Sequence, residues 1–316
     1  MRFGRGAAAE ATELVGGPFT LLTTERAAAT LPDLAQAADG VFAIGPGMVN
    51  ELAGELRPHL RAAATLVALG GGRVIDTAKS LAAADPPRRV VAIPTTLSGA
   101  EMTAIHRQAP GVPADSPRVR PAVVINDPGI SASQPELEMT ASALNALGHA
   151  VEAPLTPRAA PVPTLAALEA AQLIVRSLAV KGSPSRDGLA LAALLGGYAI
   201  DAAGYGLHHV MSQTLVRHAG VGHGQANAAM LQHTIRALAR RFPEGIARLG
   251  YAIDDDPAAV AARLAVRAGA ARLRDLGVPF ESIPELAAHA AQRPDLSLTP
   301  PAADAAELRE IYEVAW

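Results

Sequence analysis

Short runs of consecutive apolar residues recur along the first 130 residues of the chain. They lie at residues 19–24, 40–45, 64–69, 90–94 and 122–125. Stretches with helical spacing of apolar positions separate several of these runs, notably residues 46–60 and 74–84. Strands that are apolar throughout and alternate with helices are typical of a parallel sheet covered on both faces. The pattern therefore predicts an α/β domain with the architecture of a nucleotide-binding fold.

The second part of the chain has a different period. From about residue 131 the apolar positions follow the helical repeat almost without interruption. The predicted helices cover residues 135–152, 163–180, 186–215, 223–241, 257–276 and 303–315. We therefore expect an α/β protein of two domains: a Rossmann-like parallel-sheet domain over residues 1–130, followed by an all-helical catalytic domain over residues 131–316.

Length and charge agree with a globular protein of this kind. The chain has 316 residues, with 27 Lys and Arg against 30 Asp and Glu and a net charge of −3. No basic run is present, which argues against a nucleic-acid partner. The longest uncharged stretches, residues 188–200 and 202–216, fall short of the ~18 apolar residues of a membrane span. The N-terminal residues lack the apolar core of a signal peptide, so we expect a cytoplasmic protein.

The chain contains no cysteine. This excludes disulfides, thiolate–metal sites and a cysteine nucleophile. A bound metal would have to rest on histidine, carboxylate or amide ligands.

Three consecutive glycines, Gly70, Gly71 and Gly72, lie between a predicted strand and a predicted helix. Glycine lets the backbone approach a ligand closely, and the free amides at a helix start attract an anion. A second element, residues 93–103, follows the next strand and is rich in hydroxyl groups. Because ligands bind beyond the carboxyl ends of parallel strands, the two elements together favour a dinucleotide.

The residues around the first strand leave the choice of dinucleotide open. Glu25 could accept hydrogen bonds from an adenosine ribose, which favours NAD. Arg26 and Arg73 favour the 2′-phosphate of NADP instead, and all three side chains could equally be solvated surface groups.

Histidines gather in the helical half. Asn145 and His149 are four residues apart and project from one face of a predicted helix. His209 follows a glycine-rich approach, and His223 stands between two glycines at a helix start. Imidazole serves both as a proton donor or acceptor and as a ligand of iron or zinc. A metal site and an acid–base site are the two competing interpretations.

Several motifs follow one another along the chain: residues 3–6 (FGRG), 69–79 (LGGGRVIDTAK), 93–96 (IPTT), 126–128 (NDP), 140–152 (TASALNALGHAVE), 206–213 (GLHHVMSQ) and 222–233 (GHGQANAAMLQH). In this order they resemble the iron-containing alcohol dehydrogenase superfamily over nearly the whole chain. The resemblance implies the dehydroquinate synthase-like fold of that superfamily and an NAD(P)-dependent oxidoreductase.

Within the superfamily the chain is most similar to the maleylacetate reductase branch. The similar features are residues 98–103 (SGAEMT), Asn145, the His208–His209 pair and residues 294–316. The members of this branch reduce an unsaturated 2-oxo-type dicarboxylate with NAD(P)H. The resemblance therefore implies a small carboxylate-bearing substrate, for which Arg217 is a candidate partner, and a homodimer formed through the sheet edge of the first domain.

Residue roles follow from the same resemblance. The implied cofactor-binding residues are Gly70, Gly71, Gly72, Arg73, Asp76, Thr95, Thr96, Ser98, Met102 and Thr103, and Glu25 is added from its position after the first strand. The implied catalytic residues are Asn145, His149, His208, His209, Gln213 and His223.

The metal ligands of the family would fall on Asn145, His149, His209 and His223. Asn145 replaces the more usual aspartate, which removes the one negative ligand. Three neutral imidazoles and an amide would bind a divalent ion weakly, so we expect a site without metal.

Three departures from the family pattern bear on the reaction. Gln213 stands where relatives carry a histidine thought to relay protons, so His208 or His218 would have to complete that path. Arg73 replaces a serine after the glycines. A lysine expected between residues 111 and 121 is absent, and Arg118 and Arg120 stand there instead.

The leading hypothesis is hydride transfer to a carbonyl carbon in the cleft between the two domains. His149, His209 and His223, one of them protonated, would stabilise the developing alkoxide. Two alternatives stay open: a metal-dependent alcohol dehydrogenase, and a member of the superfamily that catalyses a non-redox elimination or addition in a biosynthetic pathway.

Overall fold

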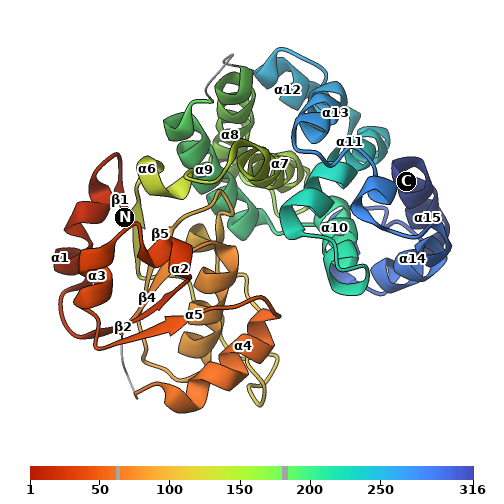
Figure 1. Cartoon of the computed structure of the whole chain (residues 1–316). Coiled ribbons are helices and arrows are strands. Elements are labelled where there is room, and N and C mark those ends of the chain that lie inside the picture. The colour runs from red at the N-terminus through yellow and green to blue at the C-terminus, as the bar shows by residue number, and fades with distance from the viewer. Residues whose placement is uncertain (62–64, 180–183) are drawn as a thin grey trace. The chain divides into compact units, whose positions relative to one another are not determined.

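The computed structural model describes residues 1–61, 65–179 and 184–316 (Figure 1). The chain forms two compact units, Met1–Gln134 and Pro135–Trp316. The boundary expected after residue 130 falls within helix α6 (Pro128–Ser131). Residues 64 and 180, at the ends of two expected elements, lie outside the described residues.

The first unit contains a sheet in which all strand pairs are parallel. Its strands are β1 (Arg2–Phe3), β2 (Phe19–Thr23), β3 (Gly40–Ala43), β4 (Thr65–Gly70), β5 (Val90–Pro94) and β6 (Val123–Asn126), in the order β1-β6-β5-β4-β2-β3. The expected parallel-sheet architecture is confirmed. Strand β1 was not expected, because two residues leave no periodic signal.

Helices and short 3₁₀ turns cover both faces of this sheet. They are η1 (Ala7–Glu10), α1 (Ala11–Val15), α2 (Glu25–Ala28), α3 (Pro32–Gln36), α4 (Val49–Leu56), η2 (Arg57–His59), α5 (Gly72–Ala84), η3 (Ala100–Met102) and α6. In strand β4, Leu66 and Ala68 pack with α4 and α5, whereas Val67 and Leu69 pack with α1, α2 and α3. Burial on both faces explains why the strand sequence is apolar without alternation.

The strand order changes direction at β2. The chain runs from β2 outward to β3 and then returns to the other side of β2 with β4, β5 and β6. The crevice at the carboxyl ends of β2 and β4 is therefore the topological switch point, where open α/β sheets bind their ligands.

The described residues of the second unit form helices and no strands. The helices are α7 (Glu136–Glu152), η4 (Ala153–Leu155), α8 (Pro161–Ala179), α9 (Arg186–Ala203), α10 (Leu207–His218), α11 (His223–Arg241), α12 (Pro243–Ile253), α13 (Pro257–Arg267), η5 (Leu273–Leu276), η6 (Phe280–Ser282), α14 (Ile283–Ala291), η7 (Pro294–Leu298) and α15 (Ala305–Ala315). Helix α7 packs against α8, α9, α11 and α13. It is the central helix of this unit, and nearly all of it after its first turn is buried.

Two of the expected helices were wrong in extent. The single helix expected over residues 186–215 is two helices, α9 and α10, bent by 103° at residues 204–206. Gly204 has φ +74°, which a right-handed helix does not accommodate. The helix expected over residues 257–276 ends at Arg267, because Gly269 has φ +65°. Apolar composition continues across both breaks and hid them from the periodicity.

Helix α8 is long and apolar enough to cross a membrane by length and composition alone, and the bent pair α9–α10 passes the same test together. Ala167, Ala170 and Ile174 of α8 are fully buried within the helical unit. Its neighbours there are α9, α7 and α12. We therefore describe α8 as a packed helix of this unit.

The segment between η3 and β6 forms no helix or strand and is held by a buried histidine. His106 Nδ1 lies 3.0 Å from the carbonyl of Arg107, and its Nε2 accepts the Val119 N–H at 3.0 Å. Since Nε2 accepts, Nδ1 carries the proton and the ring is neutral. Burial and, secondarily, the cation of Lys79 lower the pKa of His106 to about 4.

We predict that His106 makes folding sensitive to acid. Below pH 6.5 the unfolded chain takes up a proton at this ring that the folded chain does not, so stability falls as the pH drops from about 6.5 toward 4. Glutamine retains one donor and one acceptor but does not titrate. The difference in unfolding free energy between the wild type and His106→Gln should shift by about 2–3 kcal/mol in favour of the variant between pH 7.5 and 4.5.

Urea unfolding at a series of pH values measures this difference. His59→Gln, at an exposed histidine of the same unit, serves as the control and should leave the pH dependence unchanged. A constant difference between wild type and His106→Gln across the pH range would contradict the assignment.

Candidate active site

The three glycines form the turn from β4 into α5 at the switch point of the sheet. A Cβ on Gly71 would lie 3.0 Å from Thr96 Cγ2, and one on Gly72 would lie 3.1 Å from Ser98. No side chain caps the first turn of α5. The N-terminus of this 13-residue helix thus presents uncapped backbone N–H groups at a turn that has no side chains of its own and is bordered by Thr96 and Ser98. This geometry fits a phosphate or pyrophosphate group.

The loop after β5 lies beside the glycine turn. The Thr95 N–H donates to the Gly70 carbonyl at 2.9 Å, which ties the two strand ends together. The Thr96 and Ser98 side chains are only partly buried and contact the glycine positions. Met102, in η3, is partly buried as well. These side chains border the same turn, as the sequence interpretation requires.

The buried side chain of Lys79 fixes the backbone of this loop through hydrogen bonds. Its ammonium is fully buried and donates to the carbonyls of Ala100, Thr103 and Ile105 at 2.8–3.0 Å and to Thr103 Oγ1 at 3.1 Å. It also lies 2.7 Å from Asp76 Oδ1. Thr103 and Asp76, both expected to bind the cofactor, therefore have internal partners.

The remaining cofactor candidates lie at the surface. Glu25 begins α2 directly after β2 and is exposed. The Arg26 guanidinium approaches Ser133 Oγ at 3.5 Å. Arg73 is exposed and donates to the Gly45 carbonyl, after β3, at 3.2 Å. All three are at the carboxyl-end side of the sheet, and nothing in their contacts selects between NAD and NADP.

Four side chains that the sequence singled out lie together in the helical unit. Asn145 and His149 are one turn apart on α7, His209 is in the first turn of α10, and His223 begins α11. The rings of His149 and His209 stack with centroids 4.8 Å apart and an interplanar angle of 16°. His223 Nε2 lies 3.1 Å from Asn145 Oδ1. We call this group the histidine cluster.

A buried carboxylate that sequence reasoning missed organises the cluster. Glu152 Oε1 accepts the backbone N–H groups of Gly206 and His208, at 3.1 and 2.7 Å. Its Oε2 accepts the backbone N–H of His209 at 3.2 Å and the ring Nδ1–H of His209 at 2.6 Å. Thr299 Oγ1 accepts the remaining N–H, that of Leu207, at 2.9 Å. All four amides at the N-terminus of α10 are therefore satisfied.

The Glu152 contacts fix the state of His209. Burial raises the pKa of Glu152, and the N–H donors act in the opposite direction by stabilising the carboxylate. Because the carboxylate accepts, His209 carries its proton on Nδ1, and its buried Nε2 has no partner among the described residues. Glu152 is three residues after His149, and that helical spacing was the available signal.

His208 is a packing residue in this structure. Its Nδ1 lies 2.9 Å from the Thr234 hydroxyl, which itself donates to the backbone of α11. Its ring meets that of His209 edge to face, with centroids 4.9 Å apart. A Cβ on Gly148 would lie 2.6 Å from His208 Nε2, so only glycine permits α7 and α10 to approach this closely.

Burial leaves the clustered histidines uncharged near neutral pH. The pKa of His149 lies well below 6.5, and the pKa values of His208 and His209 fall to about 3. Burial also lowers the pKa of His223, although the residue as a whole is exposed. The expectation of a protonated histidine therefore conflicts with the buried position of these rings.

The residues present do not fit a divalent metal ion. Within the described ranges, no group of three or more His, Asp or Glu residues is placed to hold one. His149 and His209 stack nearly parallel, so their lone pairs lie in separate planes and do not converge on a tetrahedral centre. His223 Nε2 is engaged by Asn145, which brings no charge.

The Gln213 side chain forms hydrogen bonds with two arginines, and not with the histidine cluster. Its Oε1 accepts from Arg217 and from Arg293, each at 3.3 Å. Arg293 also pairs with Asp295 at 2.7 Å and approaches the Tyr205 hydroxyl at 3.5 Å. The Tyr205 ring lies 5.7 Å from that of His209. Arg293 is thus a cation separated from the cluster by one residue, Tyr205, and no local sequence pattern indicates it.

His218, the other residue considered for a proton path, lies elsewhere. It ends α10 and stacks on His289 with ring centroids 3.9 Å apart. The His218–His289 pair belongs to the contact between α10 and α14, three turns along from His209, and takes no part in the cluster.

A glycine turn at the switch point of a parallel sheet, followed by a helical unit that carries a polar cluster, is the arrangement expected of an NAD(P)-dependent oxidoreductase. Residues 139–316 match the model of the Fe-containing alcohol dehydrogenase family, C-terminal domain. The chain belongs to this family, as the sequence motifs indicated.

Similar proteins support the same assignment. The maleylacetate reductase of Sphingobium indicum is 35% identical over 243 residues, covering 72% of this chain and 67% of that protein. The maleylacetate reductase of Pseudomonas knackmussii is 33% identical over 255 residues, covering 78% and 72%. The crystal structure of maleylacetate reductase from Rhizobium sp. strain MTP-10005 superposes with a TM-score of 0.87 at 26% identity, covering 100% of this chain and 95% of that one. Resemblance to this branch of the family is confirmed.

We predict that Glu152→Gln destabilises the protein by about 2–3 kcal/mol. An amide nitrogen in place of either oxygen would face two N–H donors, and rotating the amide only exchanges which pair is opposed. Glu138→Gln, at an exposed position of the same helix, is the matched control and should unfold like the wild type. Chemical denaturation followed by circular dichroism measures both. Equal denaturation midpoints for the two variants would show that Glu152 does not stabilise the N-terminus of α10.

Proposed function

We propose that the chain is an NAD(P)H-dependent reductase of a small oxo-dicarboxylate similar to maleylacetate, and that it works without a metal ion. The observation that carries the proposal is the histidine cluster. Its imidazoles are neutral, its fourth member is the amide Asn145, and its one buried carboxylate, Glu152, is committed to the α10 terminus and to His209. The similarity to maleylacetate reductases supports the substrate class.

The glycine turn would hold the cofactor. The amides at the N-terminus of α5 would bind its pyrophosphate above Gly71 and Gly72, and the Thr96 and Ser98 hydroxyls would border it. When bound, the nicotinamide supplies a hydride to the carbonyl carbon of the substrate. Lys79 would act indirectly, by fixing the backbone of the loop that carries Ser98.

The histidine cluster would supply the electrophilic and acid groups. Two buried ring nitrogens of the cluster, His149 Nδ1 and His209 Nε2, have no hydrogen-bond partner within the described residues, and they would be the atoms that contact a substrate oxygen. A negative substrate and a developing alkoxide would both raise the pKa of His209, and the Glu152 carboxylate at Nδ1 would stabilise the imidazolium that forms. His209 Nε2 would take up a proton from solvent as the negatively charged substrate binds, and it would then donate that proton to the alkoxide oxygen that hydride addition forms.

Arg293 would recognise one carboxylate of the substrate. Its side chain is largely buried, and Nη1 has no hydrogen-bond partner within the described residues. The Nη2 of Arg293 donates to Asp295 and to Gln213. Its Nη1 is left to donate to an incoming carboxylate, whose two oxygens match the planar guanidinium. Gln213 cannot relay a proton as a histidine could. It would instead orient the Arg293 side chain.

A homodimer and a cytoplasmic location complete the proposal. Strand β1 is one of the two edge strands of the sheet, and its residue Phe3 and the preceding Met1 are exposed. This edge is the surface that would join two copies. Light scattering of the purified protein measures the oligomeric state directly.

The first test is cofactor binding and turnover. Nicotinamide fluorescence should show saturable NADH or NADPH binding, and maleylacetate should be reduced with oxidation of the cofactor at an unchanged rate after chelation. Gly71→Asp should abolish binding, because it puts a negative charge and a Cβ against Thr96 where the pyrophosphate lies. Gly71→Ala, which adds the Cβ alone, is the matched control and should weaken binding less.

Other outcomes point to the alternatives. Loss of activity on chelation, together with stoichiometric iron or zinc, would support a metal-dependent alcohol dehydrogenase. Cofactor binding without oxidation of NAD(P)H by any oxo-acid would support a non-redox reaction.

The second prediction concerns the substrate carboxylate. Arg293→Met should raise KM for the dicarboxylate by about 10- to 100-fold and change kcat less, since a charge-assisted bidentate contact is lost. Arg293→Lys should recover part of the loss, because it restores the charge without the planar fork. Arg272→Met, at an exposed arginine of the same unit, is the control. A KM that stays constant in Arg293→Met would exclude Arg293 from substrate recognition.

A further inference from the structure

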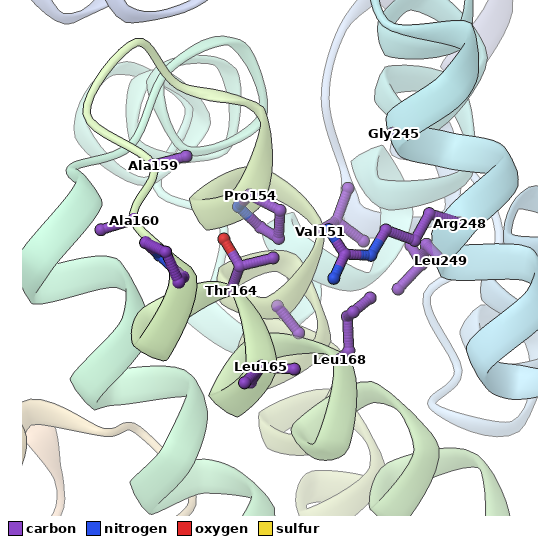
Figure 2. A pocket seen from close by; sticks show the side chains of 12 residues that line it. Val151, Pro154, Ala159, Ala160, Thr164, Leu165, Leu168, Gly245, Arg248 and Leu249 are labelled. Atoms are coloured by element: carbon purple, nitrogen blue, oxygen red, sulfur yellow. The ribbon is translucent and has the colours of Figure 1, made fainter.

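The helical unit contains a pocket of about 460 Å³ that the proposed reaction does not use (Figure 2). It lies between the C-terminal end of α7 with η4, the first turns of α8, and α12. Small residues at its edges, including Ala150, Ala160 and Gly245, leave it unfilled. Its volume is within the range of roughly 300–1,000 Å³ typical of small-molecule sites.

The walls of the pocket are mostly apolar. Val151, Pro154, Leu165, Leu168 and Leu249 line it. Val151 and Leu249 are buried, whereas Leu165 is 61% exposed, an unusual degree for a leucine beside a cavity. A ligand with an apolar body would cover this surface and remove it from water.

Arg248 is the charged residue among the described residues that line the pocket. Figure 2 shows the Arg248 side chain reaching from α12 among the apolar side chains. In the described parts of the chain, Arg248 forms no ion pair and no hydrogen bond, and none of the described lining residues is acidic. A guanidinium presented in this way selects an anion with planar, paired oxygens.

A second polar group points to the same kind of ligand. Thr164, in the first turn of α8, is only 9% exposed, and its hydroxyl has no hydrogen-bond partner among residues 1–61, 65–179 and 184–316. Figure 2 places this hydroxyl among the pocket side chains. The positive end of the α8 dipole lies at the same place, since Pro161 begins the helix. The hydroxyl and the dipole both favour an acceptor with negative charge.

The pocket is separate from the histidine cluster. None of Asn145, His149, His209 or His223 lines it. Ala150 and Val151 follow His149 directly, but successive residues of a helix point about 100° apart, so α7 presents the two sites on different sides.

We propose that this pocket binds a small organic monocarboxylate with an apolar body, its carboxylate held by Arg248 and Thr164. One guanidinium balances one negative charge, and the apolar walls exclude a bare inorganic anion, which would lose its hydration without compensation. The proposal is independent of the reductase activity.

Calorimetric titration with phenylacetate tests it, with phenylacetamide as the neutral ligand of the same shape. Phenylacetate should bind saturably, and phenylacetamide at least about 10-fold more weakly, because it cannot form the charged bidentate contact. Arg248→Met should weaken phenylacetate binding about 10-fold or more, and Thr164→Val about 3- to 10-fold. Arg176→Met, at an exposed arginine of α8 that does not line the pocket, should bind phenylacetate like the wild type.

Two further variants locate the bound molecule. Ala159→Phe fills the pocket from an exposed position on its rim, so it should abolish binding without disturbing the core. Arg293→Met should leave phenylacetate binding intact. If binding were lost in Arg293→Met and kept in Arg248→Met, the ligand would lie at the histidine cluster and the proposal would be overturned. Absence of saturable binding, or equal binding of phenylacetamide, would overturn it as well.

Discussion

The helical unit depends on one buried carboxylate. At the 103° bend between α9 and α10 the chain begins a new helix in the protein interior, where water cannot satisfy its first amides. Glu152 accepts three of those amides and Thr299 accepts the fourth. The same carboxylate holds the His209 ring. Helix start and functional side chain are therefore positioned by a single group, and neither could move without exposing buried donors.

This arrangement also explains the electrostatic character of the cluster. The negative charge of Glu152 is spread over four N–H donors, so little of it is left to attract a cation to the neighbouring rings. With Asn145 in place of an acid, burial then decides the protonation of His149 and His209 and keeps both neutral. A neutral cluster tolerates the approach of a negatively charged substrate oxygen better than a cluster of carboxylates would. Arg293, the cation proposed to bind a substrate carboxylate, is separated from the cluster by one residue, Tyr205.

The sheet could be predicted from the sequence because its central strands β2, β4 and β5 are buried on both faces. The run at residues 90–94 coincides with β5, and β4 differs from its expected run by a residue. The break at residues 204–206 was not predicted although Gly204 and Gly206 stand there, because glycines also occur inside α9, at Gly196 and Gly197. The groups that satisfy the start of α10, Glu152 and Thr299, are distant in the sequence and leave no local signal. The histidines could be chosen from their glycine neighbours. Arg293 is 80 residues from Gln213 in the sequence, and only folding brings it near the cluster. No local sequence pattern therefore indicates it.

Only two of the 27 basic residues are lysines. The contacts of one of them, Lys79, give a physical reason for a lysine at that position. Elsewhere arginine serves for ion pairs, as at Arg57 with Asp85 and Arg241 with Glu307, where its planar fork matches a carboxylate. Lys79 faces a different demand. Its acceptors are carbonyl and hydroxyl oxygens from three positions of one loop, arranged around a single nitrogen, with Asp76 on a further side. A planar guanidinium would be too large for this cage and would point its donors in one plane. The ammonium is therefore favoured by the shape of the loop that borders the glycine turn, and not by charge alone.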